Sequence, residues 1–374
     1  MKYSIEIGKI VEGALKHDYT KIRNYTEQLI NKLQLDGEER AANKFIKILN
    51  SQNNSMLNPM GSENKVPVDI ESRISMADII EVDDNNCNVI LSENNNFKLK
   101  SFILSYKNAD KLNSAGIGLS NTLLLYGPPG CGKTQCAYLI AKELKLPLVI
   151  ARLDSIISSY LGTTAKNIRT LFEYAQKMPC VLFLDEFDAI AKARDDGNEL
   201  GELKRVVNSL LQNIDSMSKD TLLIAATNHD KLLDSAIWRR FDYKLEIEIP
   251  DMKACEQLVD LFLGNNLEIT EKEKKIMSYA FAGLSGANIE NIIKKSIRNS
   301  IIFEHDLKKQ DIYEEIFSFN GIYANNGIDE RQILQKKARF LRKCNEKIFS
   351  YSVIADILNV SKTKVSTLLS EEGK

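Results

Sequence analysis

Two segments of this sequence carry residue types and spacings that suit phosphate chemistry. The first, Gly127-Pro-Pro-Gly-Cys-Gly-Lys-Thr134, matches the phosphate-loop pattern and stands between a strand-like apolar run and a helix-like segment. Its glycines let backbone N–H groups wrap around phosphate oxygens, and the following helix turns its positive dipole end toward the same anion. Lys133 can reach the β- and γ-phosphates, and the Thr134 hydroxyl suits Mg²⁺. The alternative, a glycine-rich turn with a coincidental lysine, is disfavoured by this context.

The second segment, Val181-Leu-Phe-Leu-Asp-Glu186, is an apolar strand that ends in two carboxylates. We expect Asp185 to hold Mg²⁺ through water and Glu186 to polarise the attacking water. A strand that merely reaches solvent could end in the same way. The phosphate loop about fifty residues upstream favours the catalytic interpretation.

A third strand, Leu222 to Thr227, ends in the neutral amide of Asn228. This amide could hydrogen-bond both the γ-phosphate and the attacking water without competing for protons. Asn is also a common turn former, so this assignment depends on the other two motifs.

These motifs give the region from about Asn88 to Phe303 a clear resemblance to the AAA clade of AAA+ ATPases. The resemblance implies ATP and Mg²⁺ as ligands, with Thr134 and Asp185 as the metal-binding residues. It places catalytic roles on Glu186, Asn228, Arg239 and Arg240. The nucleotide contacts that it implies are Gly127, Pro128, Pro129, Gly130, Cys131, Gly132, Lys133, Thr134, Gln135, Asp185, Gly286 and Ala287.

The sequence departs from the family pattern at the arginines. Leu233 to Asp242 resembles the segment that supplies arginine fingers to the γ-phosphate of an adjacent subunit, but the usual proline and glycine between two arginines are missing. Arg239 and Arg240 are therefore adjacent, and either could be the finger while the other anchors the subunit interface. Cys131, where many relatives have Thr, contributes mainly backbone.

Two further stretches resemble functional parts of the family. Ser158 to Gly162 is similar to the central pore loop, so Tyr160 and Leu161 would grip a polypeptide, unless Tyr160 is a core aromatic residue. Gly283 to Asn288 resembles a helix start in the small α-helical lid, where Gly286 and Ala287 would line the adenosine; Asn288 stands where many relatives have Asp.

The elements around these motifs predict an α/β fold. Apolar runs at Thr122–Tyr126, Leu148–Ala151, Val181–Leu184 and Leu222–Thr227 alternate with helical segments, which is typical of a parallel sheet covered on both faces. Leu245, Ile247 and Ile249 alternate with charged residues and indicate an edge strand. The expected order is a helical N-terminal domain (1–60), a linker (61–87), a P-loop ATPase domain (88–250), a helical lid (251–325) and a basic helix-turn-helix segment (326–374).

The last segment, residues 331–374, contains ten Lys and Arg against four Asp and Glu. Residues 351–369 fit helix, turn and helix: Asn359 suits a left-handed turn, and Ser361 can cap the second helix. Ile354, Leu358, Val360, Val365 and Leu368 would close a miniature core. Lys362, Thr363, Lys364, Ser366 and Thr367 would face outward, with Arg339, Arg342 and Lys343 available for DNA phosphates. Protein docking and plain structural closure are equally open alternatives.

Composition limits the remaining possibilities. The net charge of −1 excludes a uniformly basic nucleic-acid coat, and six cysteines without a CxxC pair argue against a disulfide framework or zinc site. We expect a cytoplasmic protein without membrane contact, because no apolar run approaches the roughly 20 residues that span a bilayer.

The leading hypothesis is a Mg²⁺-dependent ATPase that forms a homo-oligomeric ring, a hexamer in this family, and remodels or threads a protein client. A looser resemblance in layout, to bacterial ATPases paired with a subtilisin-type serine protease, implies anti-phage defence. The alternative is a DNA-binding regulator that ATP gates through the C-terminal helices.

Overall fold

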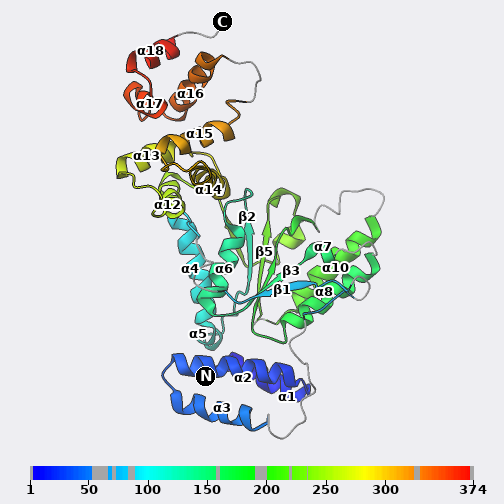
Figure 1. Ribbon diagram of the computed structural model, residues 1–374. Coiled ribbons are helices and arrows are strands. Elements are labelled where there is room, and N and C mark those ends of the chain that lie inside the picture. The colour runs from blue at the N-terminus through cyan, green and yellow to red at the C-terminus, as the bar shows by residue number, and fades with distance from the viewer. Residues whose placement is uncertain are drawn as a thin grey trace. The chain divides into compact units, whose positions relative to one another are not determined.

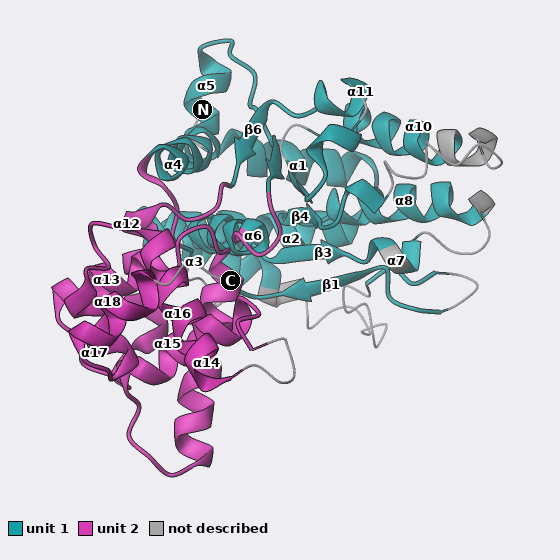
Figure 2. Cartoon of the chain, turned by 90° about the horizontal axis from the view of Figure 1, so that it is seen from above, with its two compact units in different colours: residues 1–89, 94–127, 133–247 teal, residues 90–93, 128–132, 248–374 magenta. Residues whose placement is uncertain are grey.

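The computed structural model describes residues 3–52, 66–69, 73–82, 89–156, 161–189, 200–218, 221–233, 235–323 and 329–370. The chain divides into two compact units (Figure 2). The first comprises residues 1–89, 94–127 and 133–247, and the second comprises residues 90–93, 128–132 and 248–374.

Three helices begin the first unit: α1 (Ser4–Leu15), α2 (Tyr19–Leu35) and α3 (Glu39–Gln52). Helix α2 starts where the Asp18 carboxylate accepts a hydrogen bond from the Lys21 amide. One apolar face of α2 is buried at Tyr25, Leu29, Ile30 and Leu33. Together with Ala42 of α3, Leu29, Ile30 and Leu33 form a small core between these helices.

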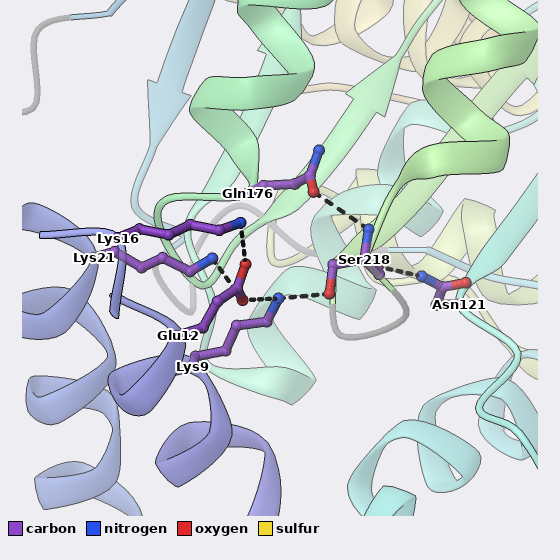
Figure 3. Close-up of polar contacts among 7 residues, drawn as sticks. All are labelled: Lys9, Glu12, Lys16, Lys21, Asn121, Gln176 and Ser218. Carbon is purple, nitrogen blue, oxygen red and sulfur yellow. Dashed lines mark hydrogen bonds and ion pairs between the residues drawn. The ribbon is translucent and has the colours of Figure 1, made fainter. Parts of the chain in front are cut away.

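Polar groups join these helices to the α/β part of the same unit (Figure 3). Lys9 Nζ in α1 donates to Ser218 Oγ at 2.5 Å. The backbone of Ser218 is held in turn by Gln176 Oε1, 3.4 Å from its amide nitrogen, and by Asn121 Nδ2, 3.1 Å from its carbonyl oxygen. The N-terminal helices therefore rest on the segment that leads into strand β5.

A six-stranded sheet forms the centre of the first unit, in the order β1-β3-β4-β5-β2-β6. Figure 1 labels β1, β2, β3 and β5 of this sheet. All neighbouring strands are parallel except β1 and β3. The four inner strands predicted from sequence agree with the structure residue for residue, and β6 lies at an edge as expected. The strands are β1 (Ala77–Ile80), β2 (Thr122–Tyr126), β3 (Leu148–Ala151), β4 (Val181–Leu184), β5 (Leu222–Thr227) and β6 (Tyr243–Glu246).

Strand β1 was not expected, because the sequence placed residues 61–87 in a linker. Its four residues run antiparallel to β3, with Ala77 opposite Ala151 and Ile80 opposite Leu148. A strand this short, followed directly by acidic residues, gives no clear period-two signal. Only the pairing with β3 identifies these residues as a strand.

Helices cover both faces of the sheet, as the continuous apolar strands predict. Leu182, Leu184 and Leu223 turn toward α8 and α10, whose apolar residues complete one large core. The alternate residues, such as Val181 and Phe183, are equally buried on the opposite face, the side of α6. The helical elements of this part are α4 (Glu93–Lys107), α5 (Ala109–Ser114), α6 (Lys133–Leu144), α7 (Leu153–Ile156), α8 (Leu161–Ala175), α10 (Leu200–Ser216), the 3₁₀ turn η2 (Asp230–Leu232) and α11 (Ser235–Trp238).

The second unit is helical in all its described elements after residue 248. Helix α13 begins with a capping box in which the Thr270 and Glu273 side chains bond each other's backbone amides. Four helices form the lid: α12 (Met252–Leu263), α13 (Glu271–Ala280), α14 (Gly286–Ile302) and α15 (Lys309–Phe319). Three more form the tail: α16 (Glu330–Cys344), α17 (Tyr351–Leu358) and α18 (Lys362–Ser370).

The tail contains two helices joined by a turn at the positions that the sequence predicted. Asn359 adopts the left-handed conformation with φ 51°, and Ser361 Oγ accepts from the Lys364 amide at 3.2 Å. Ile354, Val365 and Leu368 are buried. All five α18 side chains expected to face outward are exposed: Lys362, Thr363, Lys364, Ser366 and Thr367.

Two expectations for the tail need correction. Ile354 and Val365 do not belong to a separate miniature core, because they share one apolar core with Ile312 and Phe317 of the lid. Arg342 is not presented for DNA phosphates, since it bonds the Phe349 carbonyl at 3.1 Å and the Glu346 carboxylate at 2.6 Å.

Candidate nucleotide site

Three strands of the sheet end side by side where the chemistry-bearing residues follow them. Tyr126 of β2 pairs with Thr227 of β5, so Gly127 and Asn228 are the next residues at neighbouring strand ends. Leu184 of β4 pairs with Ala225 of β5, so Asp185 follows at the same edge. The carboxyl edge of the parallel sheet therefore gathers the phosphate loop, the carboxylates and the terminal amide.

Glycine is required at several positions of the phosphate loop. Gly127, Gly130 and Gly132 have φ angles of 135°, 72° and 99°. A Cβ at Gly127 would lie 2.2 Å from the Ile247 carbonyl oxygen, and one at Gly130 would lie 2.8 Å from Ser285 Oγ. A side chain at Gly127 or Gly130 would therefore collide with a neighbouring segment of the fold.

The lysine and threonine of the loop begin helix α6. Lys133 is buried, and its Nζ donates to the Gly127 carbonyl oxygen at 2.8 Å, so the ammonium group lies under the loop. Burial raises the pKa of the neighbouring Cys136 thiol to about 12, although Lys133 opposes this shift. Cys136 thus remains a neutral core residue. Of the other predicted contacts in and beside the loop, Pro128, Pro129 and Gln135 are exposed and Cys131 is buried.

The carboxylates after β4 meet the loop threonine. Thr134 Oγ1 donates to Asp185 Oδ2 at 2.9 Å, and Asp185 Oδ1 accepts from the Glu186 amide, also at 2.9 Å. The hydroxyl and carboxylate oxygens are the hard donors that Mg²⁺ prefers, so this pair fits the metal. Glu186 is exposed at φ 51°, a left-handed conformation that is uncommon outside glycine.

Asn228 is half-buried at the end of β5. Its neighbours form a polar group that the sequence did not indicate: Thr227 Oγ1 donates to Asp188 Oδ1 at 3.2 Å, and the His229 amide donates to Thr227 Oγ1 at 3.0 Å. Asp188 lies 39 positions before Thr227, and no spacing motif links the two.

Within the second unit, the start of α14 contacts the middle of the phosphate loop. Ser285 caps this helix, and the Ala287 amide donates to the Gly130 carbonyl oxygen at 2.9 Å. Gly286 approaches the same carbonyl oxygen, since a Cβ on Gly286 would lie 3.5 Å from it. The two residues predicted to line the adenosine therefore lie beside Gly130.

The two adjacent arginines have different surroundings. Arg240 binds Asp215 of α10 through two parallel bonds of 3.1 and 3.0 Å, and it also donates to the Ala236 carbonyl oxygen. The hydrogen bond to Asp215 raises the pKa of Arg240. Arg239 is exposed. Arg240 therefore fixes the segment after α11 to α10 of its own subunit.

Comparison with known proteins agrees with this geometry. Residues 123–249 match the family described as "ATPase family associated with various cellular activities (AAA)". The sequence is 44% identical over 232 residues to the uncharacterized AAA family ATPase y4kL of Sinorhizobium fredii (strain NBRC 101917 / NGR234), covering 62% of this chain and 70% of that protein.

This chain belongs to the AAA family of ATPases. It is also similar to the ATP-dependent zinc metalloprotease FtsH of Thermus thermophilus, at 32% identity over 53% of this chain. The FtsH of Lancefieldella parvula is 30% identical over 58% of it. The AAA chain spans about a third of the length of each of these two relatives, 33% and 35%. The likeness thus leaves about two thirds of each metalloprotease unmatched.

The family assignment identifies this AAA protein as a nucleotide-binding ATPase, and the matched residues include the phosphate loop, both carboxylates, Asn228 and the arginine pair. Tyr160 lies outside the described residues, as does the side chain of Leu161, so the pore loop stays a prediction. In the part of the chain that the structure describes, no helix combines the length and apolar character needed to cross a membrane.

Proposed function

We propose that this ATPase hydrolyses ATP at the carboxyl edge of its sheet with the roles that the sequence assigned. Lys133 binds the β- and γ-phosphates, and Thr134 and Asp185 hold Mg²⁺, which supplies charge neutralisation at the phosphates when bound. Glu186 polarises a water molecule whose oxygen bonds to the γ-phosphorus as the bond to ADP breaks. Asn228 orients that water. The 2.9 Å contact between Thr134 and Asp185 is the observation that best supports this assignment.

We assign the arginine finger to Arg239 rather than Arg240. The bidentate bonds between Arg240 and Asp215 occupy the Arg240 guanidinium within its own subunit. An exposed Arg239 can reach the γ-phosphate of the next subunit in a homo-oligomeric ring, for which the family suggests six copies. Each nucleotide site would then need two chains.

Two single substitutions and one mixture test this assignment. Arg239→Ala should lower hydrolysis by about 10³-fold while ATP affinity is kept. Arg240→Ala, the matched control, should lower stability slightly and retain hydrolysis. Mixing Arg239→Ala subunits with Lys133→Ala subunits should restore some activity, because a site from one parent meets a finger from the other. Co-assembled mixtures with no recovery would contradict a finger acting in trans.

The ring is proposed to remodel or thread a protein client gripped by Tyr160 and Leu161. Tyr160→Ala should then hydrolyse ATP normally and fail to act on an added client protein. Unfolding of this variant would favour a core position for Tyr160. A subtilisin-type protease partner, a role in anti-phage defence and a cytoplasmic location remain predictions from sequence.

A second candidate function is DNA binding through α18, which the exposed Lys362 and Lys364 side chains favour. Binding to duplex DNA should weaken with salt, and Lys362→Ala with Lys364→Ala should reduce the logarithmic salt slope by about two units. Fluorescence anisotropy measures this slope. Absence of binding at low salt, with the tail folded, would leave protein docking as the role of α18.

A further inference from the structure

We propose that Thr227 and Asp188 form a clamp between the ends of β4 and β5 that positions Glu186 and Asn228 for hydrolysis. Thr227 and Asp188 would then be positioning residues, since they act through their chain neighbours Asn228 and Glu186. This inference rests on the proposed roles of Glu186 and Asn228.

The hydroxyl of Thr227 makes two bonds that fix its direction. It donates its proton to Asp188 Oδ1 at 3.2 Å and accepts the His229 amide proton at 3.0 Å. The second bond closes a tight turn over Asn228, the residue between Thr227 and His229. Since Thr227 is 1% exposed and Asp188 6% exposed, water competes little for these bonds.

The backbone around Glu186 is tied to the same strand. The Phe187 amide donates to the Ala226 carbonyl oxygen at 2.8 Å, and the Ala189 amide donates to the Glu186 carbonyl oxygen at 2.8 Å. Glu186 itself occupies the left-handed region, a conformation that persists only where its surroundings hold it. Asp188 lies two residues beyond Glu186, so its bond to Thr227 adds a side-chain link to this backbone tie.

The clamp is separable from the strand pairing that maintains the fold. Strands β4 and β5 are joined along Val181–Leu184 and Leu222–Ala225, before either turn begins. Removal of one hydroxyl should therefore leave the sheet intact and loosen only the two turns. A misplacement of about 1 Å at a catalytic group can cost about 10²-fold in rate.

Thr227→Val removes the hydroxyl and keeps the shape of the side chain. We expect kcat for ATP to fall about 10- to 100-fold, while KM and nucleotide affinity change about twofold or less. Thr227→Ser, which restores the hydroxyl, should recover most of the lost kcat. The kcat of Asp188→Asn should lie between those of wild type and Thr227→Val, because the new amide oxygen can still accept the hydrogen bond from Thr227. The matched control is His229→Ala. The His229 ring is half exposed and lies 3.9 Å from Asp188 Oδ2, so this variant should change kcat by about twofold or less.

A double-mutant cycle on kcat distinguishes positioning of Asn228 from a purely structural role of Thr227. If the clamp acts through Asn228, Thr227→Val should cost little more kcat once Asn228→Ala is present. Additive losses, a wild-type kcat in Thr227→Val, or failure of Thr227→Ser to recover kcat would overturn the clamp. The proposed function fails separately, if Glu186→Gln hydrolyses ATP at the wild-type rate. If Thr227→Val keeps the wild-type kcat while Glu186→Gln is inactive, the clamp is rejected and the proposed function is kept.

Discussion

The two helical ends of this chain are attached to their neighbours in opposite ways. The N-terminal helices keep a small core of their own and reach the α/β part through polar groups, including Lys9 to Ser218 and Asn24 to the Lys177 carbonyl oxygen. The C-terminal helices have no such separation, because Leu341 and Ile354 lie in one apolar core with Phe317 of the lid.

This difference indicates how each end can respond to the ATPase. Apolar burial is non-directional and lost only when the surfaces separate, so the tail should move with the lid as one body. Polar contacts depend on individual donors and acceptors, and each contributes only about 1 kcal/mol net. The N-terminal helices should therefore detach while the α/β part stays folded.

The largest effect is expected from Phe317→Ala in the shared core. Phe317 is fully buried, with its ring edge-on to Phe340 at a centroid distance of 5.9 Å. Truncation should destabilise lid and tail together by about 3–5 kcal/mol. Hydrogen exchange should show amides of α15 and α16–α18 losing protection in parallel. Phe319→Ala, at a position 48% exposed, is the control and should change stability by about 0.5 kcal/mol or less. Loss of protection confined to α15 would contradict a shared core.

A smaller effect is expected from Lys9→Met at the other end. The Lys9 side chain is 5% exposed and donates to Ser218, so its loss should weaken attachment of the N-terminal helices by about 1–3 kcal/mol. Exchange should rise in α1–α3 and not in the sheet. Lys9 also pairs with Glu12 at 3.4 Å. Lys16→Met provides the control, because Lys16 pairs with Glu12 as well but is 68% exposed. Equal effects of the two substitutions would refute the role of the Lys9–Ser218 bond.

The smallest effect is a pH dependence of the stability of the N-terminal helices themselves. Hydrogen bonds from Lys16 and Lys21 lower the pKa of Glu12 to about 2 from its usual 4.5. A carboxyl group whose pKa is lower in the folded than in the unfolded protein stabilises the folded state at pH values above the unfolded pKa. The contribution of Glu12 is therefore complete above about pH 4.5 and is lost as the pH falls toward 2. Hydrogen exchange in acid should show α1 opening before the apolar lid–tail core. Simultaneous opening would remove the distinction between the two ends.

Local patterns predicted most of the sheet and were the basis for the proposed nucleotide residues. Apolar runs and motif spacing located β2 to β5, because both signals are contained in short stretches of sequence. Strand β1 was missed since only its pairing with β3 defines it. The sequence could not rank Arg239 and Arg240, because the carboxylate that engages Arg240 lies 25 positions away in α10.

The tail illustrates the same limit. Asn359 and Ser361 predicted its turn and cap correctly, because both are local preferences. The tail shares one core with the lid because residues far apart in the sequence, such as Phe317 and Val365, are buried in the same cluster. The clamp between Asp188 and Thr227 was invisible for this reason as well.

The central claim is that the carboxyl edge of the sheet hydrolyses ATP with Glu186 as the residue that polarises water. Its most direct test is to measure ATP binding and hydrolysis side by side for wild type, Glu186→Gln and Lys133→Ala. Glu186→Gln should bind ATP with nearly unchanged affinity and lose at least about 10²-fold in hydrolysis, whereas Lys133→Ala should lose binding. Equal hydrolysis rates for Glu186→Gln and wild type would contradict the account.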